Sequence, residues 1–222
     1  MPTALLCTSP VQGQILRVIK LNSCGVPVTG TGSAQIVMDA WTQVQASPQY
    51  DTGDRKITRK ANGALCTNFK IPDQFTNDEL TIDFCAWNPG LIVNTIGARL
   101  LTGSFAPTGA GFAHGTWANA TQAHWSLEVW GIGDGVSCNA AGQTVYNYWF
   151  WPHLTDGKKG DYTIGADPTM LQIVANTLDA SPLWTAGAAW LNSVPLVAGD
   201  HQGEILTTVA PPTANCIIAD YP

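Results

Sequence analysis

The stretch QILRVIKLNSCGVPVTG, residues 14–30, indicates most clearly how this chain folds. From Ile15 to Leu21 the side chains fall into two sets with a period of two residues, the spacing of a β-strand. Asn22-Ser23-Cys24-Gly25 then has the composition of a turn, because Gly25 is free to adopt a positive φ. Val26-Pro27-Val28 resumes an extended conformation. The stretch predicts a strand, a tight turn and an extended return, and nothing in it points to catalysis.

Alternation of apolar and polar residues with the same period recurs along the chain, and Gly and Pro residues separate the alternating segments. Residues 34–46 are predicted to form one long strand, and residues 157–160 a hairpin turn. About eight strands at fairly even spacing are typical of an antiparallel β-sandwich or barrel. The predicted strands are residues 15–21, 34–46, 77–87, 124–131, 145–154, 161–166, 169–178 and 204–210.

One short helix is predicted near the middle of the chain. Asn88 is a suitable N-cap, and Pro89 suits the first helical position because its fixed φ matches the helix. Apolar residues between Leu91 and Ile96 then give one amphipathic face. We therefore expect a mainly β fold, an antiparallel β-sandwich or barrel with one short flanking α-helix.

The chain contains no obvious linker, internal repeat or low-complexity segment. A single domain spanning residues 1–222 is therefore expected. The segments 103–120 and 181–203 are rich in small residues or irregular in pattern, and we expect them to be loop decorations on that domain.

Charged residues make up only 12% of the chain, whereas hydrophobic residues make up 45%. Typical domains contain about 25% charged residues. No apolar run approaches the roughly 20 residues of a membrane span, so no membrane association is predicted. A soluble protein with so few charges is expected to bury much of its uncharged surface, and an obligate assembly is one way to do so. The alternative is a secreted, Trp-rich β-protein with a neutral surface.

The net charge of −6 argues against a protein that grips nucleic acid, because phosphate binding needs clusters of Lys and Arg. An acidic balance is compatible with a conduit along which DNA slides, because like charges prevent sticking.

We expect the cysteines to be reduced thiols of an intracellular protein. Residues 1–7 lack the basic start and apolar core of a secretion signal. Six cysteines could form three disulfides, but without an export signal we expect mostly buried, reduced thiols in the cytoplasm. No pair has the CxxC spacing of a zinc site. The cysteines are at positions 7, 24, 66, 85, 138 and 216.

No pattern predicts a catalytic residue, a metal site or a cofactor. Asp78, Glu79, Asp83 and Glu128 are carboxylates that a glycosidase could use, but no spacing places two of them 5–10 Å apart. The histidines are far apart in the sequence and form no HxH or HExxH motif. The Gly-rich segments match no phosphate-binding loop. The histidines are at positions 114, 124, 153 and 201.

Residues 47–63 form the most charged segment, with six of the chain's 26 charges within ten residues. The order, acids first and bases after, suits either a solvated hairpin tip or complementary docking onto a neighbouring copy. The six residues are Asp51, Asp54, Arg55, Lys56, Arg59 and Lys60.

Nine tryptophans leave two interpretations open. Rows of exposed aromatic rings stack on sugars and would indicate a carbohydrate-binding module. Aromatic residues are also common in cores and at protein interfaces. The aromatic run around Trp149-Phe150-Trp151 lies on both faces of one predicted strand, so at least one of its faces is expected to be buried.

Several segments in order resemble the major tail tube proteins of long-tailed phages of actinobacteria. The similarity extends over nearly the whole chain, and its specificity lies in the order and spacing of short motifs. The chain departs from the family in its Trp content and in the 103–120 loop. The segments are LRVIKLNSCGVPVTG (16–30), ANGALC (61–66), LTIDFCAWNPGLIVNTIG (80–97), FWPHLTDGKKGDYTIGADPTMLQIVANTL (150–178) and DHQGEILTTVAPP (200–212).

The resemblance implies a structural virion protein and no enzyme. Six copies would close into a ring, and rings assembled in the host cytoplasm would stack into the tail tube. Tape measure and tail terminator proteins would be partners, and DNA would pass without specific binding.

The resemblance also implies roles for residues. Tyr50 to Asn62, with the six charged residues named above, is the candidate inter-ring loop. Asp39, Thr81 and Asp83 are candidates for the lumen face, from strand alternation. The alternatives are a capsid decoration or minor tail protein, or a Trp-rich carbohydrate-binding β-module.

Overall fold

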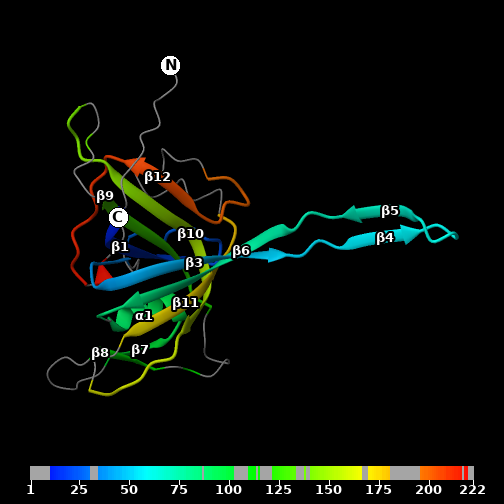
Figure 1. Cartoon of the computed structure of the whole chain (residues 1–222). Coiled ribbons are helices and arrows are strands. Elements are labelled where there is room, and N and C mark those ends of the chain that lie inside the picture. The colour runs from blue at the N-terminus through cyan, green and yellow to red at the C-terminus, as the bar shows by residue number, and fades with distance from the viewer. Residues whose placement is uncertain are drawn as a thin grey trace.

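The fold is mainly β, with antiparallel sheets and one short helix, as the sequence predicts (Figure 1). The computed structural model describes residues 11–30, 35–86, 88–102, 110–113, 115, 122–133, 138, 141–166, 170–180, 196–216 and 218–219. Its elements are β1 (Val11–Leu21), β2 (Gln35–Met38), β3 (Trp41–Asp51), β4 (Arg55–Arg59), β5 (Leu65–Lys70), β6 (Gln74–Phe84), α1 (Pro89–Ile96), β7 (Arg99–Thr102), β8 (Ala110–Ala113), β9 (His124–Gly133), β10 (Tyr146–Lys159), β11 (Leu171–Thr177), β12 (Gly203–Thr207) and β13 (Ile218–Ala219).

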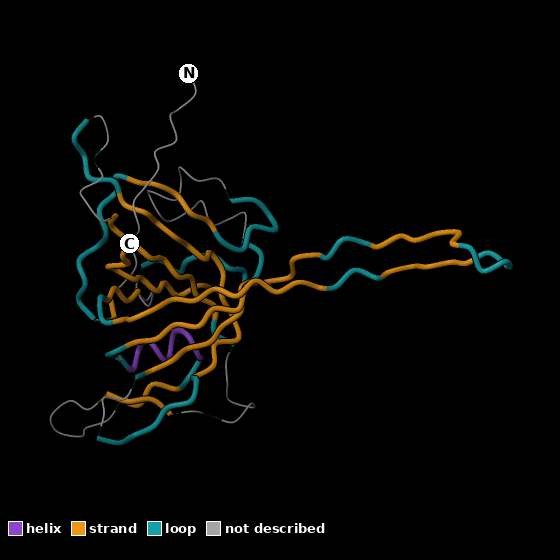
Figure 2. The backbone as a smooth tube through the Cα atoms, viewed as in Figure 1, coloured by secondary structure: helices purple, strands orange, loops and turns teal. Residues whose placement is uncertain are grey.

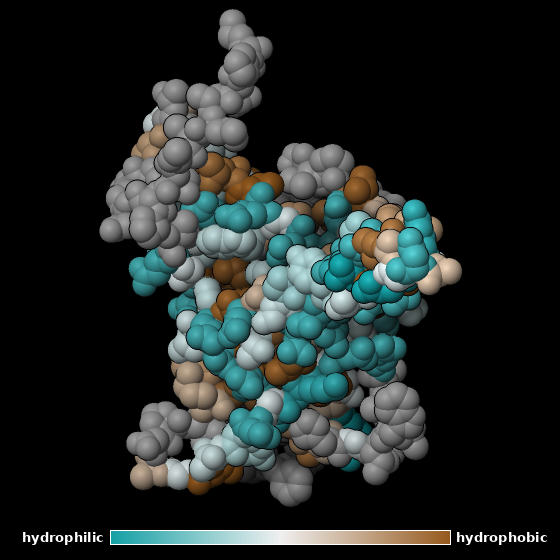
Figure 3. All heavy atoms as spheres, turned by 45° about the vertical axis from the view of Figure 1, so that its right-hand side comes forward, coloured by the Kyte–Doolittle hydropathy of each residue, from teal (hydrophilic) through white to brown (hydrophobic). Residues whose placement is uncertain are grey.

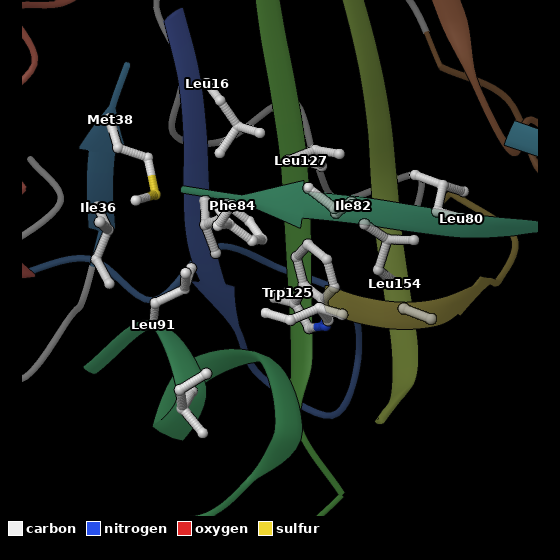
Figure 4. Packing of buried hydrophobic residues seen from close by; sticks show 14 of the residues in the cluster. Leu16, Ile36, Met38, Leu80, Ile82, Phe84, Leu91, Trp125, Leu127 and Leu154 are labelled. Carbon is white, nitrogen blue, oxygen red and sulfur yellow. The ribbon is translucent and has the colours of Figure 1, made fainter. Parts of the chain in front are cut away.

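One large antiparallel sheet organises the chain in the order β13-β2-β1-β9-β10-β11-β6-β3. The long strand β10 belongs to two parts of this sheet. Its first half, Tyr146–Phe150, pairs with β12, and its second half pairs with β11 from Leu154 onward. The sheet therefore folds over on itself at β10, and β6 crosses β1, β9 and β10 across the core (Figure 4).

The core lies between these two layers. Ile82 and Leu80 of β6 point toward Leu127 of β9 and Leu154 of β10 (Figure 4), and all four side chains are fully buried. Burying each such side chain contributes roughly 1.5–3 kcal/mol. A second cluster occupies the opposite face of the central strands, so β1 is buried on both faces. The second cluster comprises Ile19, Leu21, Trp130, Tyr148 and Phe150.

The predicted helix is present as α1 and has the predicted N-cap. The Asn88 side chain accepts a hydrogen bond from the Gly90 amide at 2.7 Å, and Pro89 occupies the first turn. Gly97 ends the helix in the left-handed conformation with φ 72°, which favours glycine. Figure 2 shows the helix lying against the strands of the body.

The prediction of one strand over residues 34–46 is wrong. The segment divides into β2 and β3, because the chain kinks at Asp39–Ala40, where the Trp41 amide donates to the Asp39 carbonyl at 3.0 Å. The two strands then lie far apart in the order of the sheet. Alternation continues through the kink, so the sequence pattern alone does not reveal it.

The predicted turn at 157–160 and the predicted strand at 161–166 are also wrong. β10 continues to Lys159, with a register shift between Thr155 and Lys158. A Cβ atom on Gly157 would lie 1.9 Å from the Thr95 carbonyl oxygen, so this glycine allows β10 to pass close to α1. Residues 161–166 follow without strand structure.

The loop expected at 103–120 contains strand β8, which pairs with β7 in a small separate sheet. Residues 103–109, 114 and 116–121 lie outside the described residues, as do residues 181–195 of the second expected decoration.

A buried ion pair lies within the central strands. Arg17 of β1 faces Glu128 of β9 directly in the register, and the Arg17 Nε donates to Glu128 Oε2. Glu128 is fully buried, and the Arg17 guanidinium lies 5.4 Å from the centre of the Trp130 ring. Burial raises the pKa of Glu128, and the charge of Arg17 opposes that rise. Burying either charge alone would cost free energy of folding, and the opposite charge of the partner offsets part of that cost.

We predict that Glu128→Leu lowers the free energy of unfolding by about 3–5 kcal/mol, because it leaves the Arg17 charge buried without its carboxylate. The double variant Arg17→Met/Glu128→Leu replaces the pair by apolar side chains of similar volume, and it should lose much less stability. Urea denaturation of both variants and the parent measures the difference. Equal losses in the two variants would contradict this account.

Candidate functional site: the hairpin arm and the groove at its root

A long hairpin leaves the body of the protein (Figures 1 and 2). Strands β3 and β6 pair from Trp41–Phe84 to Asp51–Gln74, so their ladder begins in the core and continues outward. Beyond it the Ile71 amide donates to the Asp54 carbonyl at 3.0 Å, and β4 and β5 form a ladder of their own. We call residues 49–77 the arm and Arg55–Lys70 its tip.

The six charged residues proposed from the sequence all lie on the arm and are exposed. Asp51 ends β3, Asp54 lies in the connection, and the four bases lie in β4 or just after it. The expectation of a hairpin at this segment is therefore confirmed. Its role as an inter-ring contact stays a prediction.

The arm exposes large apolar side chains to solvent. Each strand of the tip is exposed along its whole length. A two-stranded ribbon is marginally stable alone in water, and these side chains leave apolar surface on it exposed to solvent. The exposed fractions are 60% for Tyr50, 49% for Ile57, 52% for Leu65, 56% for Phe69 and 40% for Phe75.

The tip also concentrates basic residues and lacks acidic ones. Residues 55–70 contain five of the ten Lys and Arg residues and none of the 16 Asp and Glu residues. Arg55 lies opposite Lys70 in the ladder, a like-charge pairing that is unfavourable without further partners. Lys70 pairs with Asp73 at 2.9 Å, and Arg55 donates to the Asn68 side chain. The tip is a basic surface on an acidic protein.

A groove of about 970 Å³ lies at the root of the arm. Gln49 and Asn77 of the arm form part of its wall, and other lining residues come from β10 and from the end of β11. The described residues that line the groove include three carboxylates, those of Glu79, Asp156 and Asp179, and no Lys or Arg. Figure 3 views the arm side of the molecule and shows mostly hydrophilic residues on the body around the arm.

His201 joins the root of the arm to the body. Its ring packs edge-on against Phe75, with centroids 5.0 Å apart, and Phe75 packs in turn against Tyr50. The Thr177 hydroxyl lies 2.9 Å from His201 Nδ1, and His201 Nε2 lies 3.0 Å from Asp179 Oδ1. A neutral ring with its proton on Nε2 satisfies both contacts, because Thr177 then donates to Nδ1 and Nε2 donates to Asp179.

A second histidine pair lies in the same region. His124 Nδ1 is 2.9 Å from His153 Nε2, and His153 Nδ1 is 3.3 Å from the Asp179 carbonyl oxygen. Burial lowers the pKa of His153, and the neighbouring His124 lowers it further. Gly25 has φ 72°, and a Cβ there would lie 2.8 Å from His153 Nδ1. The turn predicted at residues 22–25 thus packs directly on this histidine.

Thr177, His201 and Asp179 have the order of a nucleophile, a base and a carboxylate. The Thr177 residue is only 1% exposed, however, and its hydroxyl already accepts a hydrogen bond from the Asp78 amide at 2.8 Å. This hydroxyl acts as a bridge within the protein. Among the described residues, no three His, Cys, Asp or Glu side chains are grouped to hold a metal ion.

The sequence does not predict this site, because its histidines are far apart along the chain. The fold brings His124, His153 and His201 to one end of the body, while His114 lies outside the described residues. The only signal available was the turn at residues 22–25, whose close packing on His153 the sequence does not reveal.

The three candidate lumen residues occupy two different places. Thr81 and Asp83 of β6 lie on one face, half-buried, and Gln172 donates to Asp83 Oδ1 at 2.9 Å. Asp39 lies in the kink between β2 and β3 and is exposed. Glu79 shares the face of Thr81 and Asp83 and also lines the groove, so this polar face and the groove are continuous.

The expectation of mostly buried cysteines is wrong for the described residues. Four of the five described cysteines are exposed, the fifth is half-buried, and all five are free thiols. Cys24 lies in the groove, and Cys66 lies on the tip of the arm. Cys24 is exposed because it lies in a turn, and Cys66 because it lies on the two-stranded tip. The core covers neither thiol. The other three are Cys85, Cys138 and Cys216.

No protein-family model matches the sequence, and no curated protein matches it. Within the described part of the chain, no helix is both long enough and apolar enough to cross a membrane.

We predict that the free energy of unfolding falls as the pH drops below about 6.5, and that His153 contributes to this fall. Its pKa is lower in the folded state, so the unfolded chain binds the proton more readily and acid favours unfolding. The fall should be complete once the pH is below the lowered pKa. His153→Gln removes this titration, so its stability should depend less on pH between 7 and 5. Parallel stability profiles for the variant and the parent would contradict the assignment.

Proposed function

We propose that this chain is the structural subunit of a phage tail tube, in which six copies close into a ring and the rings stack. The subunit would assemble in the host cytoplasm and reside in the tail of the virion. The observation that carries the proposal is the arm, a projecting hairpin with exposed apolar and basic side chains. Such a hairpin serves to contact another molecule, and a repeated contact between copies builds rings and filaments.

The reach of the arm supports a contact between subunits. From Gln49 to Asn62 the chain advances about 3.3 Å per residue, so the arm spans roughly 40 Å. That length matches or exceeds the diameter of a small domain, about 30 Å. The tip can therefore contact the next subunit in a stack.

The edge of the sheet supports ring closure. β3 ends the order of the large sheet and has a strand partner on one side only among the described strands. Edge strands offer free backbone groups for pairing, and pairing between copies would join sheets into one barrel. The polar face with Thr81 and Asp83 would then line the lumen, where amides and carboxylates would let DNA pass without specific binding. Tape measure and tail terminator proteins would be further partners.

We predict that removing the tip abolishes tube formation and leaves the subunit folded. Residues 55–70 are replaced by Asn-Gly, which suits a two-residue hairpin turn, because Asp54 and Ile71 are already hydrogen-bonded at 3.0 Å. The tip strands pair only with each other, so the body loses no strand contact. Negative-stain electron microscopy over a concentration series should show hollow tubes for the parent and none for the variant.

The control for this variant is its unfolding curve, which should match that of the parent. Tubes formed by a folded variant would refute the role of the arm. Trimers or monomers of the parent at every concentration would favour a capsid decoration or minor tail protein.

One observation favours the carbohydrate-binding alternative. A cavity of about 350 Å³ is lined by Trp41, Trp149 and Trp151, with Gln202 and Glu204 beside them. Tryptophan rings and a carboxylate could bind a sugar ring. However, Trp151 is buried and the other two rings are half-buried, so none is presented as an exposed platform. Four further tryptophans, at positions 87, 117, 184 and 190, lie outside the described residues.

We predict no saturable change in tryptophan fluorescence when the protein is titrated with soluble polysaccharides. None of the three rings is presented as an exposed platform on which a sugar could stack, which opposes binding. A saturable change that is lost in Trp149→Ala, but kept in Tyr162→Ala, would instead favour the carbohydrate-binding module.

A further inference from the structure

The groove and the tip of the arm have opposite chemistry. The described residues lining the groove include Glu79, Asp156 and Asp179 without any Lys or Arg. The tip contains five bases and no acid. Outside the tip the chain carries five Lys and Arg against 16 Asp and Glu, so a second copy of this chain is itself an acidic partner for the tip.

The tip does not reach the groove of its own chain. The groove lies at the root of the arm, and the β3–β6 ladder carries the tip away from it. Figure 1 shows the tip at the far end of the arm, pointing away from the body. A tip that occupies this groove must therefore belong to another copy.

We propose that the tip of one copy, Arg55–Lys70, binds in the groove at the arm root of another copy. This inference rests on the proposed function and adds the identity of the receiving surface.

The side chains of the two surfaces are complementary, because the tip offers bases and the groove offers carboxylates. Lys56 and Lys60 make no ion pair among the described residues, so both are available to carboxylates. The guanidinium groups of Arg55 and Arg59 can each bind a carboxylate through two parallel hydrogen bonds. Glu79 and Asp156 are exposed and can accept such bonds from an arriving chain.

The root of the arm also offers apolar contact. Leu178 lines the groove and is 39% exposed. Phe75 lies exposed on the arm and packs against Tyr50 and against His201, which is another lining residue. Ile57 and Phe69 of an incoming tip would find apolar partners there. Covering these side chains removes apolar surface from water in both copies.

Two native cysteines provide the test of position. Cys24 lines the groove and Cys66 lies on the tip, and both are exposed. Assembled full-length protein, prepared as a mixture of ¹⁵N-labelled and unlabelled copies, is treated with a short bis-maleimide and digested. Mass spectrometry should find Cys24–Cys66 peptide pairs that combine labelled and unlabelled halves, which proves a link between copies. Cys24→Ser and Cys66→Ser should each abolish this product, whereas Cys138→Ser should not.

Charge reversal provides the test of chemistry. The tip variant Lys56→Glu/Arg59→Glu and the groove variant Glu79→Lys/Asp156→Lys should each need at least a tenfold higher protein concentration to assemble. Mixing the two variants should restore assembly, because the introduced glutamates can then meet the introduced lysines, while the native tip of one variant meets the native groove of the other. Asp161→Lys/Glu204→Lys reverses two exposed acids away from the groove and should assemble like the parent.

The outcomes separate this inference from the proposed function. Tubes that give no Cys24–Cys66 product and tolerate the groove variant would overturn the inference and leave the tail tube function standing. A parent protein that never assembles and gives no mixed-label product would overturn both. A mixed-label Cys24–Cys66 product without tubes would support the docking contact and refute the tube.

Discussion

The pairing of β3 with β6 is the interaction on which the rest of the structure depends. At its inner end, Ile82 and Phe84 of β6 are buried in the main core. At its outer end, the same ladder continues past Asp51–Gln74 into solvent. Because one hydrogen-bonded ladder connects core and arm, the direction of the arm is set by the packing of the body. Without the buried inner half, the outer ribbon would be only marginally stable.

Charged residues have different roles in the interior of the protein and on its surface. Inside, Arg17 and Glu128 neutralise each other between adjacent strands, and Trp130 covers the guanidinium. Outside, the tip carries five of the ten Lys and Arg residues and no carboxylate, whereas the described residues lining the groove include three carboxylates and no Lys or Arg. The interior pair is satisfied within one chain, whereas Lys56 and Lys60 of the tip make no ion pair among the described residues. This difference is why we assign the pair to folding and propose a role in assembly for the arm.

Most of the fold could be predicted from the sequence, because strand periodicity and helix capping are local. The strand ending at Leu21, the turn at Gly25 and the helix capped by Asn88 all follow from neighbouring residues. The extension of β10 through Gly157 depends on its close approach to the distant residue Thr95, and the kink at Asp39 does not interrupt the apolar alternation, so periodicity predicts neither. The charged hairpin was recognisable from composition alone. The groove was not, because its histidines and carboxylates come from strands far apart in the sequence.

The β3–β6 ladder also has a mechanical consequence. Its hydrogen bonds run perpendicular to the strands, as in any antiparallel pair. A tensile load applied to the tip along the arm is parallel to both strands and is resisted inside the body, where β6 is held by β11 on its other side. To extract β6 from between its neighbours, such a load must shear many bonds at once, whereas a load at right angles would open them one by one. The protein is therefore stiff along its arm and compliant across it, and in the tube that we propose this would let stacked copies bend without parting.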